Sequence, residues 1–122
     1  MLIPYQLLAK FVLAASGQGT FAFPVPQGQT LNVDEMVFTS TGAWQLVGLS
    51  NSNGLQYTNA TPAAGIPSVN LSNGANNNNN IRDFKPDLVI KGGEQLLVTI
   101  LDTSVAPNTV NLVFNCSREM QA

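Results

Sequence analysis

Carboxylates are the side chains of this sequence best suited to acid–base chemistry, because the chain contains no histidine. Asp34 and Glu35 are adjacent, and adjacent side chains of a strand point to opposite faces unless a bulge intervenes. A general acid–base pair needs both groups within reach of one substrate. We therefore expect Asp34 and Glu35 to occupy a solvated strand edge or a bulge, and not a catalytic site.

A second group of carboxylates, Asp83 and Asp87, could offer oxygen ligands to calcium. Their spacing does not match a calcium-binding loop, and Arg82 and Lys85 are close enough in sequence to neutralise them. We expect a salt-bridged or solvated loop here, and no metal site.

Nucleophilic catalysis by serine or threonine requires an activating base. The sequence contains neither a Ser-x-x-Lys nor a Gly-x-Ser-x-Gly motif, and it has no phosphate-binding loop ending in Gly-Lys-Ser/Thr. We predict that the protein is not an enzyme and that it has no catalytic residues and no cofactor. An enzyme that acts through Asp34, Glu35 or Asp83 is the third of three alternatives.

Cys116 is the single cysteine, so no disulfide can form within the chain. It continues an alternating apolar row formed by Val110, Leu112 and Phe114. We expect its side chain to be a small buried hydrophobic group.

The composition indicates a protein that packs against neighbours. Only 10% of the 122 residues are charged, compared with about 25% in an average soluble domain. The five Lys and Arg residues are scattered and the net charge is -2, so we expect no nucleic-acid binding. The apolar stretch 7–15 is far shorter than the ~20 residues that cross a bilayer, so we expect no membrane span. Residues 1–122 are predicted to form one domain.

Period-two alternation of apolar residues predicts strands throughout the chain. In one strand the apolar phase switches near Asp34-Glu35, which predicts a bulge. Trp44 and Leu46 are expected on one face of a strand, with Val47 and Leu49 on the other. The region 51–80 is rich in Asn, Ser and Gly and is predicted to be a long loop with one short strand. The expected strands include 10–15, 43–49, 55–59, 87–91, 94–101 and 109–116.

Seven to nine short antiparallel strands separated by turn signals predict an all-β fold, a single-domain β-sandwich. Long connections suit Greek-key crossings, so a jelly roll is the expected subtype.

The C-terminal half resembles a pattern found in small jelly-roll proteins of bacteriophage virions. The resemblance is carried by residues 83–98 (DFKPDLVIKGGEQLLV), 102–104 (DTS) and 108–114 (NTVNLVF). It implies a structural component of the virion, either a capsid decoration or cement protein or a vertex (penton-type) protein. The implied partners are the major capsid protein and copies of the chain itself, as a trimer or pentamer. The resemblance transfers no functional residue.

The first eight residues are more apolar than a free terminus should be. We predict that residues 1–8 form an arm that docks on a neighbouring subunit, since depletion of charge marks the cores of interfaces. The predicted interface residues are Leu2, Ile3, Tyr5, Leu7 and Leu8.

A carbohydrate- or receptor-binding β-sandwich is the alternative from another functional class, with residues 51–80 as the binding loop. Exposed aromatic side chains such as Trp44, Tyr5 or Tyr57 could stack on sugars. Trp44 lies beside Leu46 in an apolar strand, however, so we expect it in the core.

Overall fold

The computed structural model describes residues 2–58, 64–68 and 88–120, and this part of the chain is built from β-strands. No helix in it is long and apolar enough to cross a membrane. Eight strands occur within it, in agreement with the seven to nine predicted. They are β1 (Leu2–Leu13), β2 (Gln18–Pro24), β3 (Gln29–Ser40), β4 (Trp44–Asn51), β5 (Ile66–Pro67), β6 (Leu88–Lys91), β7 (Gln95–Asp102) and β8 (Asn108–Met120).

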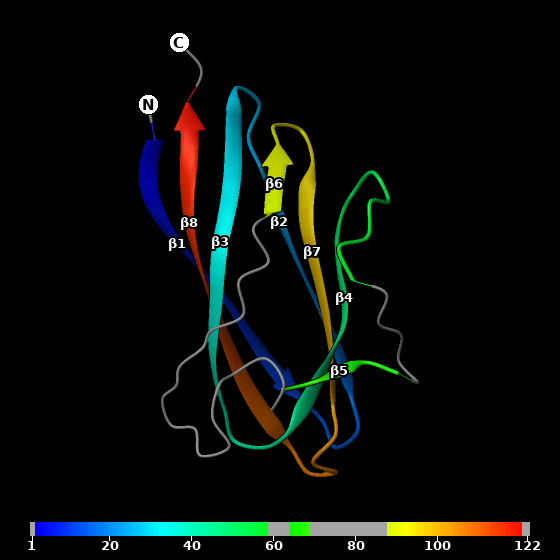
Figure 1. Cartoon of the computed structure of the whole chain (residues 1–122). Helices are drawn as coiled ribbons and strands as arrows, with labels where there is room; N and C mark the ends of the chain where they lie inside the picture. Colours follow the sequence, from blue (N-terminus) through cyan, green and yellow to red (C-terminus); the bar gives the residue numbers. More distant parts are fainter. Residues whose placement is uncertain (1, 59–63, 69–87, 121–122) are drawn as a thin grey trace.

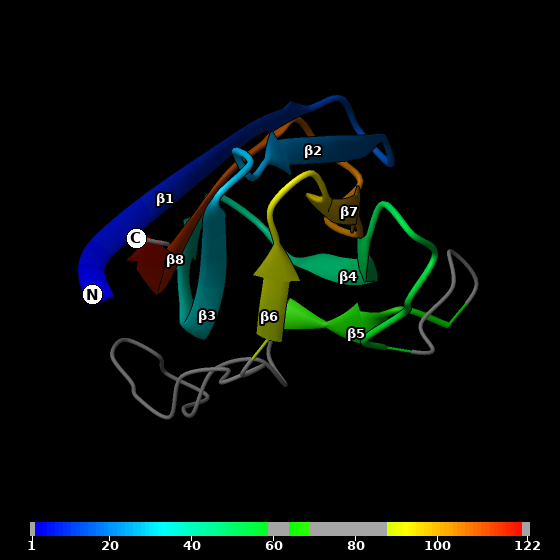
Figure 2. The same ribbon diagram turned by 90° about the horizontal axis from the view of Figure 1, so that it is seen from above.

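The strands form two four-stranded antiparallel sheets, which confirms the predicted β-sandwich. Sheet A has the strand order β1-β8-β3-β6, and sheet B has the order β2-β7-β4-β5. Figure 1 shows the long strands of sheet A beside each other, and Figure 2 shows the two sheets from above. The first and last strands pair along their whole length, so the two ends of the described chain lie side by side.

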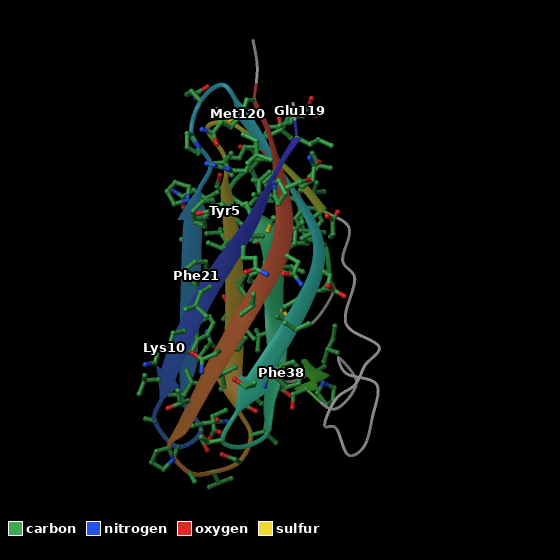
Figure 3. All side chains as sticks on the ribbon, turned by 90° about the vertical axis from the view of Figure 1, so that its left-hand side faces the viewer. Tyr5, Lys10, Phe21, Phe38, Glu119 and Met120 are labelled. Atoms are coloured by element: carbon green, nitrogen blue, oxygen red, sulfur yellow. The ribbon has the colours of Figure 1, made fainter. Side chains whose placement is uncertain are left out.

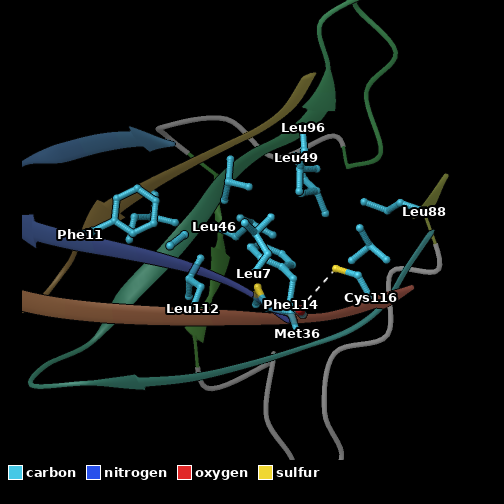
Figure 4. Close-up of a cluster of buried hydrophobic side chains, with 14 of the residues drawn as sticks. Leu7, Phe11, Met36, Leu46, Leu49, Leu88, Leu96, Leu112, Phe114 and Cys116 are labelled. Carbon is cyan, nitrogen blue, oxygen red and sulfur yellow. Dashed lines mark hydrogen bonds between the residues drawn. The ribbon is translucent and has the colours of Figure 1, made fainter. Parts of the chain in front are cut away.

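The core lies between the sheets and is filled by alternate residues of the strands. Along β8 the inward residues Val110, Leu112, Phe114 and Cys116 are buried, as their spacing predicts. Figure 4 shows Phe114 and Cys116 among the buried side chains. The strand predicted at 94–101 is β7, which lies between β2 and β4 as a central strand.

A bulge in β3 resolves the change of apolar phase. The pairing of β3 with β8 shifts register between Val33 and Glu35. The extra residue turns the strand by one position, so Val33 before the bulge and Met36 after it both point into the core. The predicted bulge is confirmed.

A second bulge, in β4, corrects the predicted faces of that strand. The pairing of β4 with β7 shifts between Leu46 and Gly48, so Val47 is the extra residue. Leu49 therefore joins Trp44 and Leu46 in the core, and its expected place on the opposite face is wrong.

The N-terminal segment is also arranged differently from the expectation. Residues 2–8 do not form a separate arm, because they are the first part of β1 and pair with β8. The strand expected at 10–15 consequently begins earlier and ends at Leu13. The strand expected at 55–59 is reduced to an isolated bridge between Ser50 and Gln56. Most of the predicted loop 51–80, together with Asp83 and Asp87, lies outside the described residues.

Candidate functional site

The Asp34–Glu35 pair lies at the bulge of β3 on the outside of sheet A. Asp34 is exposed, whereas the Glu35 carboxylate accepts a hydrogen bond of 2.9 Å from the side-chain amide of Asn115 on β8. The structure therefore places the pair in the bulge, as expected. In the described part of the chain, no group of three or more His, Cys, Asp or Glu side chains could hold a metal ion.

Cys116 is a buried thiol at the inner face of β8. Its side chain is 7% exposed, and its Sγ donates a hydrogen bond of 3.3 Å to the carbonyl oxygen of Phe114 (Figure 4). Burial, and then the nearby charge of Asp34, raise the pKa of the thiol to about 11. The thiol is therefore protonated at neutral pH and acts as a packing group.

Asp102 is the most strongly hydrogen-bonded carboxylate in the described residues. It ends β7 and is only 2% exposed. Oδ1 accepts hydrogen bonds from the backbone N–H and the hydroxyl of Ser104, at 3.1 and 2.6 Å, and from the Asn108 amide at 3.0 Å. Oδ2 accepts the backbone N–H groups of Ser16, at 2.8 Å, and of Val105, at 3.1 Å.

This hydrogen bonding determines the ionisation of Asp102. Burial disfavours the charged form, but the hydrogen bonds from Ser104, Ser16 and Asn108 outweigh burial and hold the pKa of Asp102 well below its ordinary value of 3.8. Backbone and amide donors thus stabilise a buried anion, and no salt bridge is needed to account for its charge.

The Asp102 cluster fastens three connections at the end of the sandwich opposite the chain ends (Figure 1). Ser16 lies in the β1–β2 turn and Val105 in the β7–β8 loop, and both have left-handed backbone angles, with φ of 57° and 58°. Asn108 Oδ1 accepts the backbone N–H of Gly42 and the hydroxyl of Thr41, in the β3–β4 turn, at 3.0 and 3.1 Å. The left-handed geometry is unfavourable for valine, and the hydrogen bonds to Asp102 offset that cost. The cluster therefore holds the loops in one conformation.

A comparable arrangement fastens the loop after β4 to the opposite end of the sandwich. Asn51 is 6% exposed, and its side-chain oxygen accepts the backbone N–H groups of Asn53 and Leu55 at 3.0 and 3.1 Å. The Glu94 carboxylate accepts hydrogen bonds from the side chains of Asn51 and Asn53 and from the backbone N–H of Lys91. Glu94 thus has a structural role in joining this loop to the turn between β6 and β7.

The aromatic residues considered for sugar binding do not form an exposed platform. Trp44 is fully buried and packs edge-on against Phe38, with ring centroids 4.9 Å apart. Tyr5 is half-buried beneath the guanidinium of Arg118, which lies 4.7 Å from the ring centroid. Tyr57 is half-buried against the core. The predicted core position of Trp44 is confirmed.

The outer face of sheet A is the most distinctive surface of the described chain (Figure 3). Leu2, Leu8 and Val12 project from it on β1 and are 59%, 58% and 76% exposed. Leu8 is paired with Val113 of β8, and Val113 is paired with Val37 of β3, so an apolar row crosses three strands. Polar uncharged residues of β8 flank this row, namely Asn111, Asn115 and Ser117.

The five predicted interface residues divide between the two sides of β1. Leu2 and Leu8 point outward and are exposed, whereas Leu7 is buried and Ile3 and Tyr5 are partly buried. Leu2 and Leu8 are therefore the most accessible of the five to another molecule. Val12, Val37 and Val113 were not singled out from the sequence. Their common face becomes evident only once the pairing of β1 with β8 and β3 is known.

Comparison with known proteins reveals no relationship. No protein-family model matches the chain, and neither the curated proteins nor the solved structures include a match.

Proposed function

We propose that this chain is a non-enzymatic structural component of a bacteriophage virion. It would act through contacts with the major capsid protein and with copies of itself. Either a decoration or cement protein on the shell or a penton-type vertex protein fits this proposal, as does a trimer or pentamer. The observation that carries the proposal is the outer face of sheet A, which exposes leucine and valine side chains on a chain in which only 10% of the residues are charged.

The strand order supports the finer proposal that the sandwich is a jelly roll. The strands pair as nested partners: β1 with β8, β2 with β7, β3 with β6, and β4 with β5. Two further pairings, β8 with β3 and β7 with β4, join these four strand pairs into two sheets. An eight-stranded double sheet of this kind is typical of jelly rolls, which recur in viral capsid proteins. The strand and turn pattern of the C-terminal half points to the same class.

The chemistry of the surface supports contact with protein rather than catalysis. Leu8 is exposed, and Val113 and Val37 beside it are partly exposed. Burial of exposed apolar area is the main driving force of protein association. Hydrogen bonds around Asp102 and Glu94 hold the loops at the two ends of the sandwich in place. A fixed shape limits the entropy that is lost when a subunit enters an assembly.

Quantitative mass spectrometry of purified virions tests this proposal, using the phage whose genome encodes the chain. We expect the protein to copurify with the major capsid protein at a constant ratio across gradient fractions. A high ratio would identify a shell-wide cement and a low ratio a vertex protein. Absence of the chain from intact particles, with its presence in the soluble lysate, would refute the proposal.

A further inference from the structure

The four outer strands of the two sheets differ greatly in how open their edges are. The end strands of sheet B are β5, which has 2 residues, and β2, which ends at Pro24. The end strands of sheet A are β6, with 4 residues, and β1, with 12. A short edge strand offers few backbone groups to another strand. In the described part of the chain, β1 is therefore the longest of the four edges, with 12 residues against 7 for β2.

The backbone groups that β1 presents at this edge follow from the pairing of β8. The N–H and C=O groups of Thr109 both bond to Thr41, on the β3 side of β8, at 3.0 and 3.1 Å. Backbone groups alternate between the two sides of a strand, so Asn108 and every second residue after it face β1. The residues of β1 that pair with them are every second residue from Leu13 back to Ile3, and these direct their backbone groups toward β8.

The remaining residues of β1 consequently direct their backbone groups to the open edge. These are Leu2, Pro4, Gln6, Leu8, Lys10 and Val12. Pro4 lacks an N–H group and belongs at an edge position of this kind. The same residues direct their side chains to the outer face of sheet A, so the open hydrogen-bonding row and the exposed apolar side chains coincide.

We infer that β1 pairs antiparallel with β1 of a second copy of this chain, which joins the two A sheets into one continuous eight-stranded sheet. A strand that pairs with itself about a two-fold axis is self-complementary, as a symmetric dimer requires. The partner strand also matches β1 in length. The inference rests on the strand geometry and does not depend on the proposed place in a virion.

The apolar row, together with Pro4 and the single charge Lys10, favours one register of this pairing. With Leu8 on the two-fold axis, Leu8 faces Leu8 of the second copy and Lys10 faces Gln6, while Pro4 falls at the end of the ladder. If the two-fold axis passes through Leu7 instead, Pro4 lies opposite Lys10 inside the ladder, where a hydrogen bond is lost. If the axis passes through Lys10, the two Lys10 side chains face each other, and like charges directly opposite each other are destabilising. The intermediate register, centred on Ala9, places Lys10 opposite Leu8 and separates the apolar rows. The Leu8-centred register keeps Pro4 at the end of the ladder, opposite Val12, keeps the two lysines apart and joins the apolar rows of the two sheets.

Sedimentation equilibrium of the full chain tests the contact. We expect Leu8→Lys to raise the dimer dissociation constant more than about tenfold, because it replaces a leucine contact by two opposed ammonium groups. Leu55→Lys is the matched control, since Leu55 is 57% exposed against 58% for Leu8 and lies outside sheet A. A monomeric wild-type chain, or equal effects of the two variants, would overturn the inference. A larger oligomer that is insensitive to Leu8→Lys would overturn the β1 contact and leave the proposed structural role intact.

Pairs of spin labels test the register separately. Labels on Leu2→Cys and Val12→Cys lie at the periphery of the contact, and the buried Cys116 is left unlabelled. At about 3.4 Å per residue, the Leu8-centred register places the two labels about 27 Å apart for Val12→Cys and about 41 Å apart for Leu2→Cys. Equal distances at the two positions would contradict the Leu8-centred register, and dimers with no defined distance would contradict pairing of β1.

Discussion

Replacement of Asp102 by asparagine should strongly destabilise the fold although the two side chains have nearly the same shape. The carboxylate accepts hydrogen bonds from donors on both oxygens. An asparagine amide has one oxygen and one NH₂ group. If its oxygen accepts from Ser16 and Val105, its NH₂ group faces the N–H of Ser104 and the amide of Asn108. In the opposite orientation, Ser16 and Val105 lose their acceptors.

The magnitude follows from the two nitrogen donors that lose a partner in either orientation. Hydrogen bonds to a charged group contribute about 1.5–3 kcal/mol each, so we expect Asp102→Asn to lower the free energy of unfolding by about 3–6 kcal/mol. Domains of this size have a total stability of about 5–15 kcal/mol. The variant should therefore be close to unfolding at room temperature, or unfold well below the wild-type temperature.

Urea denaturation followed by Trp44 fluorescence measures this loss, with Asp34→Asn as the control for the change of charge. Asp34 is exposed, and we expect its replacement to cost less than about 0.5 kcal/mol. If Asp102→Asn were as mild as Asp34→Asn, the hydrogen-bonding role assigned to Asp102 would be refuted.

The pH dependence provides an independent check on Asp102. Because the native pKa of Asp102 lies below its ordinary value of 3.8, the unfolded chain takes up a proton at a higher pH than the native chain. The stabilisation by this carboxylate is therefore complete above about pH 4 and is lost progressively as the pH falls below that value. Asp102→Asn should lack this part of the acid sensitivity. The stability difference between wild type and variant should consequently narrow at low pH, and a constant difference would count against the assignment.

Three further outcomes follow from the core. Phe114→Ala removes a fully buried ring and should cost about 3–5 kcal/mol in urea denaturation; a loss below 1 kcal/mol would be inconsistent with its place between the sheets. The Cys116 thiol, with its pKa raised to about 11, should react with a disulfide reagent at pH 8 far more slowly in the native chain than in urea, and equal rates would show that it is accessible. Titration with simple sugars should leave the emission of the buried Trp44 unchanged, so a saturable shift would favour the carbohydrate-binding alternative.

The sequence predicts most accurately those strands that bury one face. In β8, Val110 to Cys116 alternate without exception between core and surface, so their spacing is enough to assign the strand and its inner face. The bulge in β3 is also predictable, since the apolar phase changes between Val33 and Met36. In β4, by contrast, Leu46, Val47 and Leu49 are all apolar, so the shift at Val47 leaves no trace in the pattern.

The features that depend on distant segments could not be predicted. Residues 2–8 have apolar side chains in both phases, and the strand that orders them, β8, lies at the other end of the described chain. The Asp102 cluster joins Ser16 and Thr41, which lie in two separate connections, through Asp102 and through Asn108 at the start of β8. Ser104 and Val105 follow Asp102 within three residues, so a turn at this carboxylate is a local feature. The donor from Ser16 depends on the tertiary fold and leaves no mark in the sequence.

Cryo-electron microscopy of the virion is the most direct test of the central claim that this chain works as a structural subunit. The account predicts density for the eight-stranded sandwich on the particle, with the outer face of sheet A, including Leu8 and Val113, covered by a neighbouring protein chain. A particle map without this sandwich, or one in which that face is turned fully to solvent, would contradict the account.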